Sequence, residues 1–418
     1  MLSKTVLENG ITVASDYIDT IDSVSLNISF KIGSRNETKE NNGISHFIEH
    51  MLFKGTEKRT AKNIATDFED IGASSNAYTS KENTCYYAKV LNEYAEQCFE
   101  ILADMVQNSI FDKTELERER NVILQELAMT LDTPDDMITE YYNNTAFKDQ
   151  AYGRSILGTE ENISSFQKND FIRYMNNYYT TNNLYITSTG NLEHSKLIDF
   201  VNKYITKIPQ SNNNNLEKAY YTGGYLLKQK ELEQVQCILG FQGLSYNYKN
   251  YYKYFLFNHI FGGSMSSRLF QEVREKQGLC YTIYSSNSPT YETGSFDIYT
   301  AIEPSNIEQA LKAIINEIKN FKSNPITQEE FKRAKIRIKS ILLMQQENTG
   351  ARATELLSNL MYKNKLPSKQ EIIDEINNAT IEDLMEIIND IVNSTPTLAI
   401  YGNVENKNYY DYINNLLK

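Results

Sequence analysis

The chain has 418 residues, 40% of them hydrophobic and 23% charged, a balance typical of a globular protein long enough for two domains. Its formal net charge of −12 argues against nucleic acid as a partner, because phosphate backbones are bound by basic surfaces. The sequence shows neither a targeting peptide nor an apolar run near the ~20 residues that span a bilayer, so we expect a cytoplasmic protein without membrane contact.

The first half of the chain predicts strands and helices in short runs. Alternating apolar residues over 3–34 indicate strands, with a hairpin turn at Asn9-Gly10. Further on, the patterns predict helices over 44–53 and 61–71, the strands SSNAYTS and NTCYYAKVL, and helices over 92–108 and 114–131.

The stretch 209–224, PQSNNNNLEKAYYTGG, is polar and has no apolar periodicity, which is typical of a linker. We therefore predict one domain over 1–208 and a second domain over 225–418.

The second domain repeats the pattern of the first. YLLKQKELEQVQCILGFQGLS predicts a strand pair, and YYKYFLFNHIFGG and SRLFQEVREKQG predict helices in the order seen before. Matching landmarks lie at nearly constant offsets: 206 from Gly72 to Gly278, 209 from His50 to His259, and 212 from Gly190 to Gly402. These offsets indicate a tandem duplication, and the mixture of hairpins and helices predicts the α+β class with two mostly antiparallel sheets.

The segment His46-Phe47-Ile48-Glu49-His50 carries the strongest functional signal. On a helix, positions 46 and 50 share a face one turn apart, so both imidazoles can reach one Zn²⁺ at about 2.0–2.1 Å. Glu49 lies beside them as a candidate catalytic base, and the whole forms the HxxEH pattern, the inverse of HExxH. A chance pairing is the alternative, but burying these groups unpaired among apolar side chains costs free energy, which favours a metal site.

A catalytic zinc usually has a third protein ligand, which should come from the same domain. The helix predicted over 114–131 offers Glu119 and Glu126, which are seven residues apart and share a face. Glu126 lies in the apolar setting ILQEL, so spacing and context favour it slightly, with Glu119 as the other candidate. Whichever does not bind the metal could orient a ligand.

The second domain provides an internal comparison for this site. Its matching positions are Phe255, Asn258, His259 and Ile341, so only one histidine remains and no zinc site is expected. We interpret His259 as an ordinary, partly buried residue and expect His194, in a polar stretch after a strand, at the surface.

Five segments together resemble one known family: GISHFIEHMLFKGTEKR, NAYTSKENTCYYAKV, ERERNVILQELAM, YGRSILGTEENI and SRLFQEVREKQGLCYTIYS. They resemble the pitrilysin, mitochondrial processing peptidase and insulin-degrading enzyme family of zinc metallopeptidases, the inverzincins, and most of all its short bacterial branch. The resemblance spans nearly the whole chain. The compact segment FGGSMSSRLF lacks the long glycine-rich loop of the non-catalytic processing-peptidase subunit, so the chain is more similar to a catalytic one.

The resemblance implies roles for residues that spacing alone leaves open. It implies Glu126 as the third metal ligand, because the family places a glutamate about 75 residues after the motif, and Glu119 as the carboxylate behind the ligands. Arg274 and Tyr281, an R-x6-Y pair, are expected to reach the substrate carbonyl or its tetrahedral intermediate. Family members of this length also imply a homodimer that closes around a chamber and completes its sites in trans.

The sequence therefore predicts an endopeptidase with one Zn²⁺ per chain, acting on peptides or unfolded precursor segments. The strand Asn76-Ala77-Tyr78-Thr79 is expected at a sheet edge, where an extended substrate adds to it through main-chain hydrogen bonds, together with Arg274 and Tyr281. The alternative is a structural or assembly subunit that keeps the fold without the activity.

Overall fold

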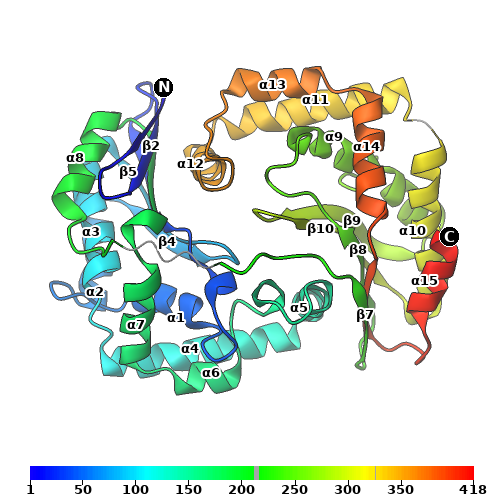
Figure 1. The fold of residues 1–418 in the computed structure, drawn as a ribbon, viewed down its shortest axis with the longest axis horizontal. Helices are drawn as coiled ribbons and strands as arrows, with labels where there is room; N and C mark the ends of the chain where they lie inside the picture. The colour runs from blue at the N-terminus through cyan, green and yellow to red at the C-terminus, as the bar shows by residue number, and fades with distance from the viewer. Residues whose placement is uncertain (211–215, 325) are drawn as a thin grey trace. The chain divides into compact units, whose positions relative to one another are not determined.

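The computed structural model describes residues 1–210, 216–324 and 326–418, so residues 211–215 of the predicted linker lie outside the described residues. The chain forms two compact units, and neither is continuous in sequence (Figure 1). Unit 1 contains residues 1–129, 154–217 and 344–366, and unit 2 contains residues 130–153, 218–343 and 367–418.

Unit 1 contains a six-stranded sheet in the order β1-β2-β6-β3-β5-β4. Every neighbouring pair is antiparallel except β2 and β6. The strands are β1 (Leu2–Val6), β2 (Thr12–Tyr17), β3 (Ser23–Phe30), β4 (Ser74–Thr79), β5 (Thr84–Leu91) and β6 (Leu184–Gly190). The helices are α1 (Ile44–Met51), α2 (Ala61–Asp70), α3 (Ala95–Asn108), α4 (Lys113–Asp132, whose last turn belongs to unit 2), α6 (Glu160–Ser165), α7 (Lys168–Tyr178), α8 (His194–Tyr204) and α12 (Thr349–Ser358).

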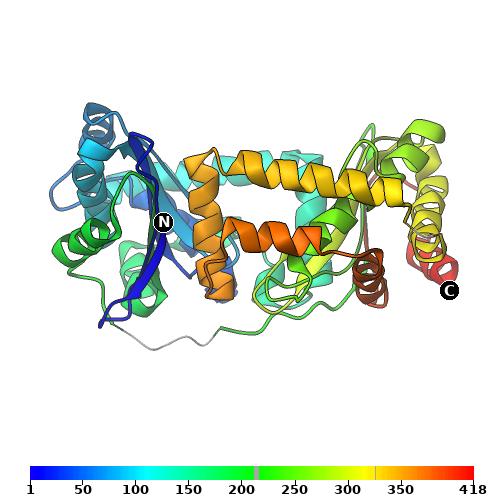
Figure 2. The same cartoon turned by 90° about the horizontal axis from the view of Figure 1, so that it is seen from above.

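The two faces of this sheet differ in polarity. Alternate residues of β3, Val24, Leu26, Ile28 and Phe30, enter a core that includes the apolar sides of α1 and α3. The intervening Ser25, Asn27 and Ser29 point to the opposite face, where α12 packs across β2, β3 and β6. Figures 1 and 2 show α12, in orange, beside the blue strands of this unit, on the other side of the sheet from α3 and α8.

Unit 2 contains a five-stranded sheet in the order β7-β11-β8-β10-β9, in which only β7 and β11 are parallel. The strands are β7 (Gly224–Gln229), β8 (Val235–Gln242), β9 (Cys280–Pro289), β10 (Gly294–Ile302) and β11 (Thr397–Gly402). The helices are α5 (Pro134–Ala146), α9 (Tyr251–Phe261), a π-helix (Phe270–Lys276), α10 (Ile307–Ser323), α11 (Gln328–Gln345, whose end enters unit 1), α13 (Lys369–Asn377), α14 (Ile381–Val392) and α15 (Tyr409–Leu417).

The two sheets share one topology, because β7-β11-β8-β10-β9 repeats β2-β6-β3-β5-β4. The landmark glycines also match in conformation: φ is +64° at Gly72 and +62° at Gly278, and +129° at Gly190 and +149° at Gly402. The predicted α+β class with two homologous, mostly antiparallel sheets is thereby confirmed.

One detail of the predicted topology is wrong. The two strands over YLLKQKELEQVQCILGFQGLS form, as β7 and β8, but they are not paired with each other. The last strand of the repeat, β11, lies between them, parallel to β7 and antiparallel to β8. Sequence neighbours suggest a hairpin, whereas the sheet is completed by a strand almost 160 residues further along the chain.

One helix from each half of the sequence packs on the sheet of the other half. The first-half helix α5 contacts β7, β8 and β11 of unit 2, and the second-half helix α12 contacts the sheet of unit 1. Each covers the sheet face opposite the main helical core, so both faces of each sheet bear helices.

No helix among the described residues has the length and apolar composition that a bilayer crossing requires.

Candidate metal centre

The helix α1 carries the predicted motif, and its packing determines which side chains face outward. Ile44, Phe47, Ile48 and Met51 are buried in the core of unit 1. Helical periodicity then places His46, Glu49 and His50 together on the remaining face, where all three are half-buried.

The start of α1 is held by a buried carboxylate. The backbone N–H groups of Gly43 and Ser45 donate to Glu37 at 2.8 and 2.9 Å, and Asn42 Nδ2 donates to the same carboxylate at 2.8 Å. Burial raises the pKa of Glu37 to about 7, against these hydrogen bonds. Gly43 adopts φ +98°, a conformation that disfavours a side chain, so the turn into the helix is fixed by sequence.

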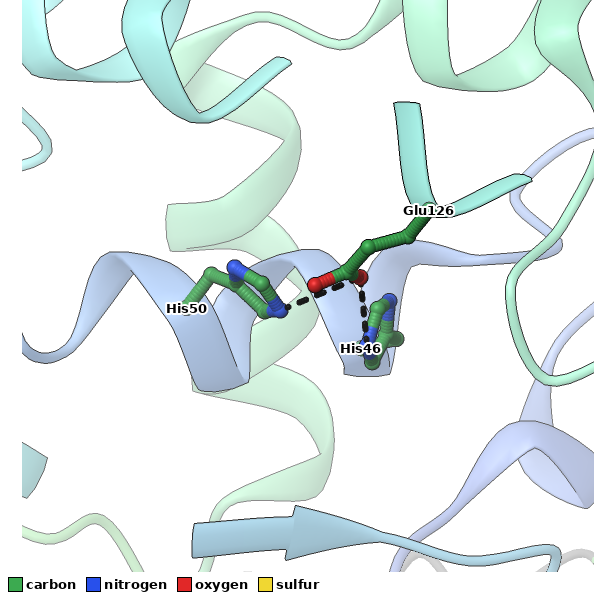
Figure 3. A group of neighbouring side chains, drawn as sticks. All are labelled: His46, His50 and Glu126. Atoms are coloured by element: carbon green, nitrogen blue, oxygen red, sulfur yellow. Dashed lines mark ion pairs between the residues drawn. The ribbon is translucent and has the colours of Figure 1, made fainter. Parts of the chain in front are cut away.

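Figure 3 shows His46 and His50, one turn apart on α1, pointing toward Glu126 from α4. Glu126 Oε2 lies 3.7 Å from His46 Nε2 and 3.6 Å from His50 Nε2. One ligand atom from each residue lies within 4.8 Å of the others, so the structure brings together the two predicted histidines and the favoured carboxylate.

This donor set fits a zinc-type ion. Two imidazoles and a carboxylate are the ligands of many catalytic zinc sites, and nitrogen or oxygen ligands at 2.0–2.1 Å in a tetrahedron lie about 3.3 Å apart. The separations of 3.6 and 3.7 Å are too long for good hydrogen bonds but close to that ligand spacing.

The two imidazoles differ in how readily they give up a proton to a metal ion. Burial, reinforced by the neighbouring His50, lowers the pKa of His46 to about 3, so His46 is neutral. Burial opposes charge on His50 as well, but the hydrogen bond to Glu119 and the nearby Glu126 and Glu49 outweigh it, and its pKa is raised. A neutral imidazole is the form that binds metal, so an ion and a proton would compete for His50.

Glu119 lies behind His50 rather than beside the ligand cluster. Its Oε2 is 3.0 Å from His50 Nδ1, an arrangement that directs the Nδ1 proton to the carboxylate and leaves Nε2 facing Glu126. Burial acts to raise the pKa of Glu119, but the contacts with His50 and Lys54 prevail and lower it.

Lys54 belongs to this group and was not predicted from the sequence. Its Nζ lies 2.8 Å from Glu119 Oε1, and the Glu119 side chain is only 8% exposed. The sequence does contain a signal for Lys54. It lies four residues after His50, the spacing that places two side chains on one face of a helix, although α1 itself ends at Met51.

Glu49 is held in place from the neighbouring strand. Thr79 Oγ1 at the end of β4 donates a 2.6 Å hydrogen bond to Glu49 Oε2. Burial raises the pKa of Glu49, and the Thr79 hydrogen bond only partly offsets this effect. A carboxyl with a raised pKa, fixed next to a candidate metal site, has the properties of a general base.

The strand β4, which contains Asn76, Ala77 and Tyr78, forms the edge of the unit 1 sheet, as expected. It pairs only with β5 within this sheet, so the main-chain groups on its other side face outward, among them the Ala77 N–H, which donates to the exposed Asn76 Oδ1 at 2.8 Å. Ala77 and Thr79 lie on the α1 side, while Asn76 and Tyr78 point to the opposite face.

Arg274 and Tyr281 belong to unit 2. The Arg274 guanidinium lies 5.6 Å from the centre of the Tyr281 ring and 4.6 Å from that of Phe270. Tyr281 is 73% exposed at the start of β9, and Arg274 lies on the π-helix, a form of helix that is frequent at functional sites. The two predicted residues therefore form one pair, in which Tyr281 is exposed and Arg274 is partly exposed.

The remaining histidines are not clustered with other candidate ligands among the described residues. His259 is partly buried, as expected, and the hydrogen bond that Ser285 donates to Asn258 at 2.6 Å repeats the contact between Thr79 and Glu49. The expectation for His194 was wrong: it is half-buried, with Ser15 and Thr5 hydroxyls each 2.9 Å from its ring nitrogens. The hairpin that brings Thr5 close was predicted, but its contact with α8 was not.

Comparison with known proteins then identifies the family. Residues 12–160 match the family model described as Insulinase (Peptidase family M16), and residues 165–338 match the Peptidase M16 inactive domain. A Rickettsia felis protein named an uncharacterized zinc protease is 41% identical over 397 residues, covering 95% of this chain and 96% of that protein. The chain belongs to peptidase family M16.

Two further M16 comparisons extend this result. The beta subunit of the mitochondrial-processing peptidase of Saccharomyces cerevisiae is 28% identical over 426 residues, covering 97% of this chain and 90% of that subunit. The crystal structure of a peptidase M16 inactive domain from Pseudomonas fluorescens superposes with a TM-score of 0.90 at 20% identity, covering 98% of this chain and 99% of that one, and confirms the fold.

The M16 assignment confirms the family that the sequence resembled and the enzyme class expected from it, a metallopeptidase. The pairing of an M16 peptidase model with an inactive-domain model also agrees with the presence of the ligand cluster in unit 1 alone among the described residues.

Proposed function

We propose that this M16 protein is a zinc-dependent endopeptidase that cleaves peptides or unfolded segments bound in an extended conformation. The observation that supports the proposal most directly is the convergence of His46, His50 and Glu126 on one point, with Glu49 beside them. The Rickettsia felis and Saccharomyces cerevisiae relatives, one named a zinc protease and one a processing-peptidase subunit, support the choice of metal and reaction.

In this proposal His46, His50 and Glu126 hold one Zn²⁺ per chain. When bound at such a site, zinc lowers the pKa of a water molecule to about 7 and polarises the substrate carbonyl. Glu119 fixes the orientation of His50 through its Nδ1, and Lys54 fixes Glu119.

Glu49 is the general base. Because Thr79 donates to Oε2, the other carboxylate oxygen, Oε1, is the one that takes the proton from the attacking water. The same carboxyl then delivers that proton to the leaving amine. Its raised pKa brings the carboxyl closer to the pH at which it must both accept and donate a proton.

We propose further that the substrate adds to β4 as an antiparallel strand. Main-chain hydrogen bonds to Asn76 and Ala77 read an extended backbone more than a particular sequence. Arg274 and Tyr281 are proposed to stabilise the oxyanion in the site of a second copy of the chain, in a homodimer. The location of the protein in the cytoplasm stays a prediction.

Glu49→Gln tests the proposal. The purified chain is loaded with Zn²⁺, its metal content is measured, and a peptide library is digested and analysed by mass spectrometry. We expect the wild type to cleave and Glu49→Gln to retain about one zinc while losing cleavage by at least ~100-fold, because the proton acceptor is gone. The matched control is Glu57→Gln, an exposed glutamate of the same unit that pairs with Lys207.

Normal turnover by Glu49→Gln would refute the base assignment. A wild-type chain that binds zinc but cleaves nothing in the library would instead support the alternative, a non-catalytic assembly subunit.

A further inference from the structure

A pocket lies on the face of the unit 1 sheet that is turned away from α1. It has a volume of about 630 Å³, within the range of ligand sites, and all its lining residues belong to unit 1. One wall is the sheet, from β3 through β5 to β4, and the other is the start of α12.

The pocket exists because α12 presents small residues to a polar part of the sheet. Gly350, Ala351 and Ala353 line the helix wall, and a Cβ added at Gly350 would meet only the side-chain oxygen Oδ1 of Asn348 within 4 Å, outside the helix's own backbone. Elsewhere α12 packs closely: Leu356 of the helix and Leu360 just after it pack with Ala14, and Arg352 pairs with Asp16. The gap is therefore local to the β3–β5–β4 side of the helix.

The floor of the pocket contains a polar side chain, Asn27, that can accept a further hydrogen bond. Asn27 is 6% exposed, and its Nδ2 donates to Thr187 Oγ1 at 3.1 Å. Its Oδ1 accepts no hydrogen bond from the described residues, although it lines the pocket. Ser25, beside it on β3, donates to Thr349 at 3.3 Å. Because the Asn27 oxygen faces the pocket and has no donor in the described part of the chain, an N–H or O–H group of a ligand could donate to it.

The rim of the pocket is β4, the strand proposed to receive the substrate. Ser74 and Tyr78 line the pocket, whereas Thr79 points to the other face and contacts Glu49. A strand added to β4 has side chains that alternate in the same way. Side chains on one face of it approach the metal centre, and those on the other face pass over Ser74 and Tyr78 into the pocket.

We propose that this pocket is a specificity subsite, and that it accepts an aromatic side chain with a hydrogen-bond donor, tyrosine above all, from the substrate strand. The inference rests on the proposed function, since it needs the substrate on β4. Tyr78 and Tyr87, with ring centroids 6.3 Å apart, and the alanines of α12 offer flat, largely apolar walls for a ring. A tyrosine hydroxyl can donate to Asn27 Oδ1.

Lys89 determines which substrate side chains the pocket disfavours. It is the one charged residue among those lining the pocket, and it lies opposite Ser25 and Ser74 on neighbouring strands. A lysine or arginine side chain entering the pocket would meet a like charge, so basic residues are disfavoured at these positions of the substrate.

Ala351→Phe tests the subsite by filling it, with Ala65→Phe on the exposed face of α2 as the matched control. A host peptide carries tyrosine, alanine or lysine in turn at each position flanking its cleavage site. We expect the wild type to prefer tyrosine over alanine by about tenfold in kcat/KM at alternate positions only, as in other apolar side-chain pockets. Ala351→Phe should reduce this preference to less than about twofold, and Ala65→Phe should keep it.

Equilibrium binding of the same peptides to the zinc-loaded Glu49→Gln chain, followed by fluorescence anisotropy, makes the result independent of turnover. Here too tyrosine should improve binding about tenfold, and the added Ala351→Phe change should remove the gain. Lys89→Glu, an exposed change that avoids repacking α12, should raise the relative affinity for lysine peptides about tenfold.

Equal binding of tyrosine and alanine peptides, or a tyrosine preference that survives Ala351→Phe, would overturn the subsite. A chain that shows the binding preference but never cleaves would leave the subsite standing and overturn the peptidase activity instead.

Discussion

The orientation of His50 depends on a chain of charged contacts that ends outside the motif. His50 Nδ1 meets Glu119 at 3.0 Å, and Glu119 meets Lys54 at 2.8 Å. Lys54 keeps the Glu119 carboxylate charged in a largely buried position, and the charged carboxylate is what holds the Nδ1 proton. The His50 nitrogen that is proposed to bind the metal is thus selected by a residue with no place in the HxxEH pattern.

Lys54→Ala should therefore weaken zinc binding without removing a ligand. Changes in the groups behind a metal ligand typically cost about 10–100-fold in affinity, and we expect a loss of that size, measured by competition with a chromogenic chelator. Lys58→Ala is the control, because Lys58 is 67% exposed and pairs with Glu100. Unchanged affinity in Lys54→Ala would mean that Glu119 orients His50 without help.

The same reasoning predicts different roles in zinc binding for the two glutamates of α4. Glu126 faces both imidazoles, whereas Glu119 faces only the far nitrogen of His50. Glu126→Ala should bring bound zinc well below one equivalent after dialysis, because a ligand is lost. Glu119→Ala should keep near-full occupancy at saturating zinc but with weaker affinity. Metal analysis of the two variants side by side tests this assignment. If Glu119→Ala lost the zinc and Glu126→Ala kept it, the roles of the two glutamates would be exchanged.

At the scale of elements, α5 is held on the unit 2 sheet around a partly buried acid. Asp297 on β10 lies beside Tyr142 of α5 with its Oδ1 enclosed, and Ser295 Oγ donates to its Oδ2 at 3.1 Å. Burial raises the pKa of Asp297 from 3.8 to about 7, against the contacts with Tyr142 and Ser295. The acid is therefore largely neutral in the fold at slightly acidic pH.

This shift makes the stability of unit 2 depend on pH. Between about pH 4 and pH 7 the folded state binds the Asp297 proton and the unfolded state does not, so the free energy of unfolding falls as pH rises through this window. Asp297→Asn should abolish this loss and stabilise the protein relative to wild type by about 1–4 kcal/mol at pH 8 and by only about a third of that amount at pH 5. Thermal unfolding of both at the two pH values checks it, with exposed Asp19→Asn as control. An equal difference at both pH values would contradict it.

At the scale of the whole molecule, periodicity and spacing predicted much of this structure. Helical periodicity predicted that His46 and His50 share a face of α1, whereas it left Glu119 and Glu126 of α4 open, and the family resemblance favoured Glu126, which the structure places beside both histidines. The near-constant offsets along the chain predicted the repeated sheet, which the matching conformations of Gly72 and Gly278 bear out.

What escaped prediction depends on contacts between distant segments. An amphipathic pattern shows that α5 and α12 have apolar faces but does not say which sheet each will cover, and each packs on the sheet of the other half. The contact between Thr79 and Glu49 depends on where β4 ends relative to α1, which strand propensity does not fix. Lys54 was missed because its partner lies 65 residues away in sequence.

The proposed dimer leads to a test that uses two inactive chains. If Arg274 and Tyr281 of one copy serve the zinc site of another, a chain with Glu49→Gln still offers a sound Arg274, and a chain with Arg274→Ala still offers a sound Glu49. Each mixed dimer then has two sites, and only one of them combines an intact Glu49 with an intact Arg274. Random mixing makes about half of the dimers mixed, so we expect about a quarter of wild-type activity from the unfractionated mixture and about half from purified mixed dimers. Differently tagged chains, purified as mixed dimers before the peptide assay, give the measurement. Mixed dimers with no activity would show that each chain completes its own site.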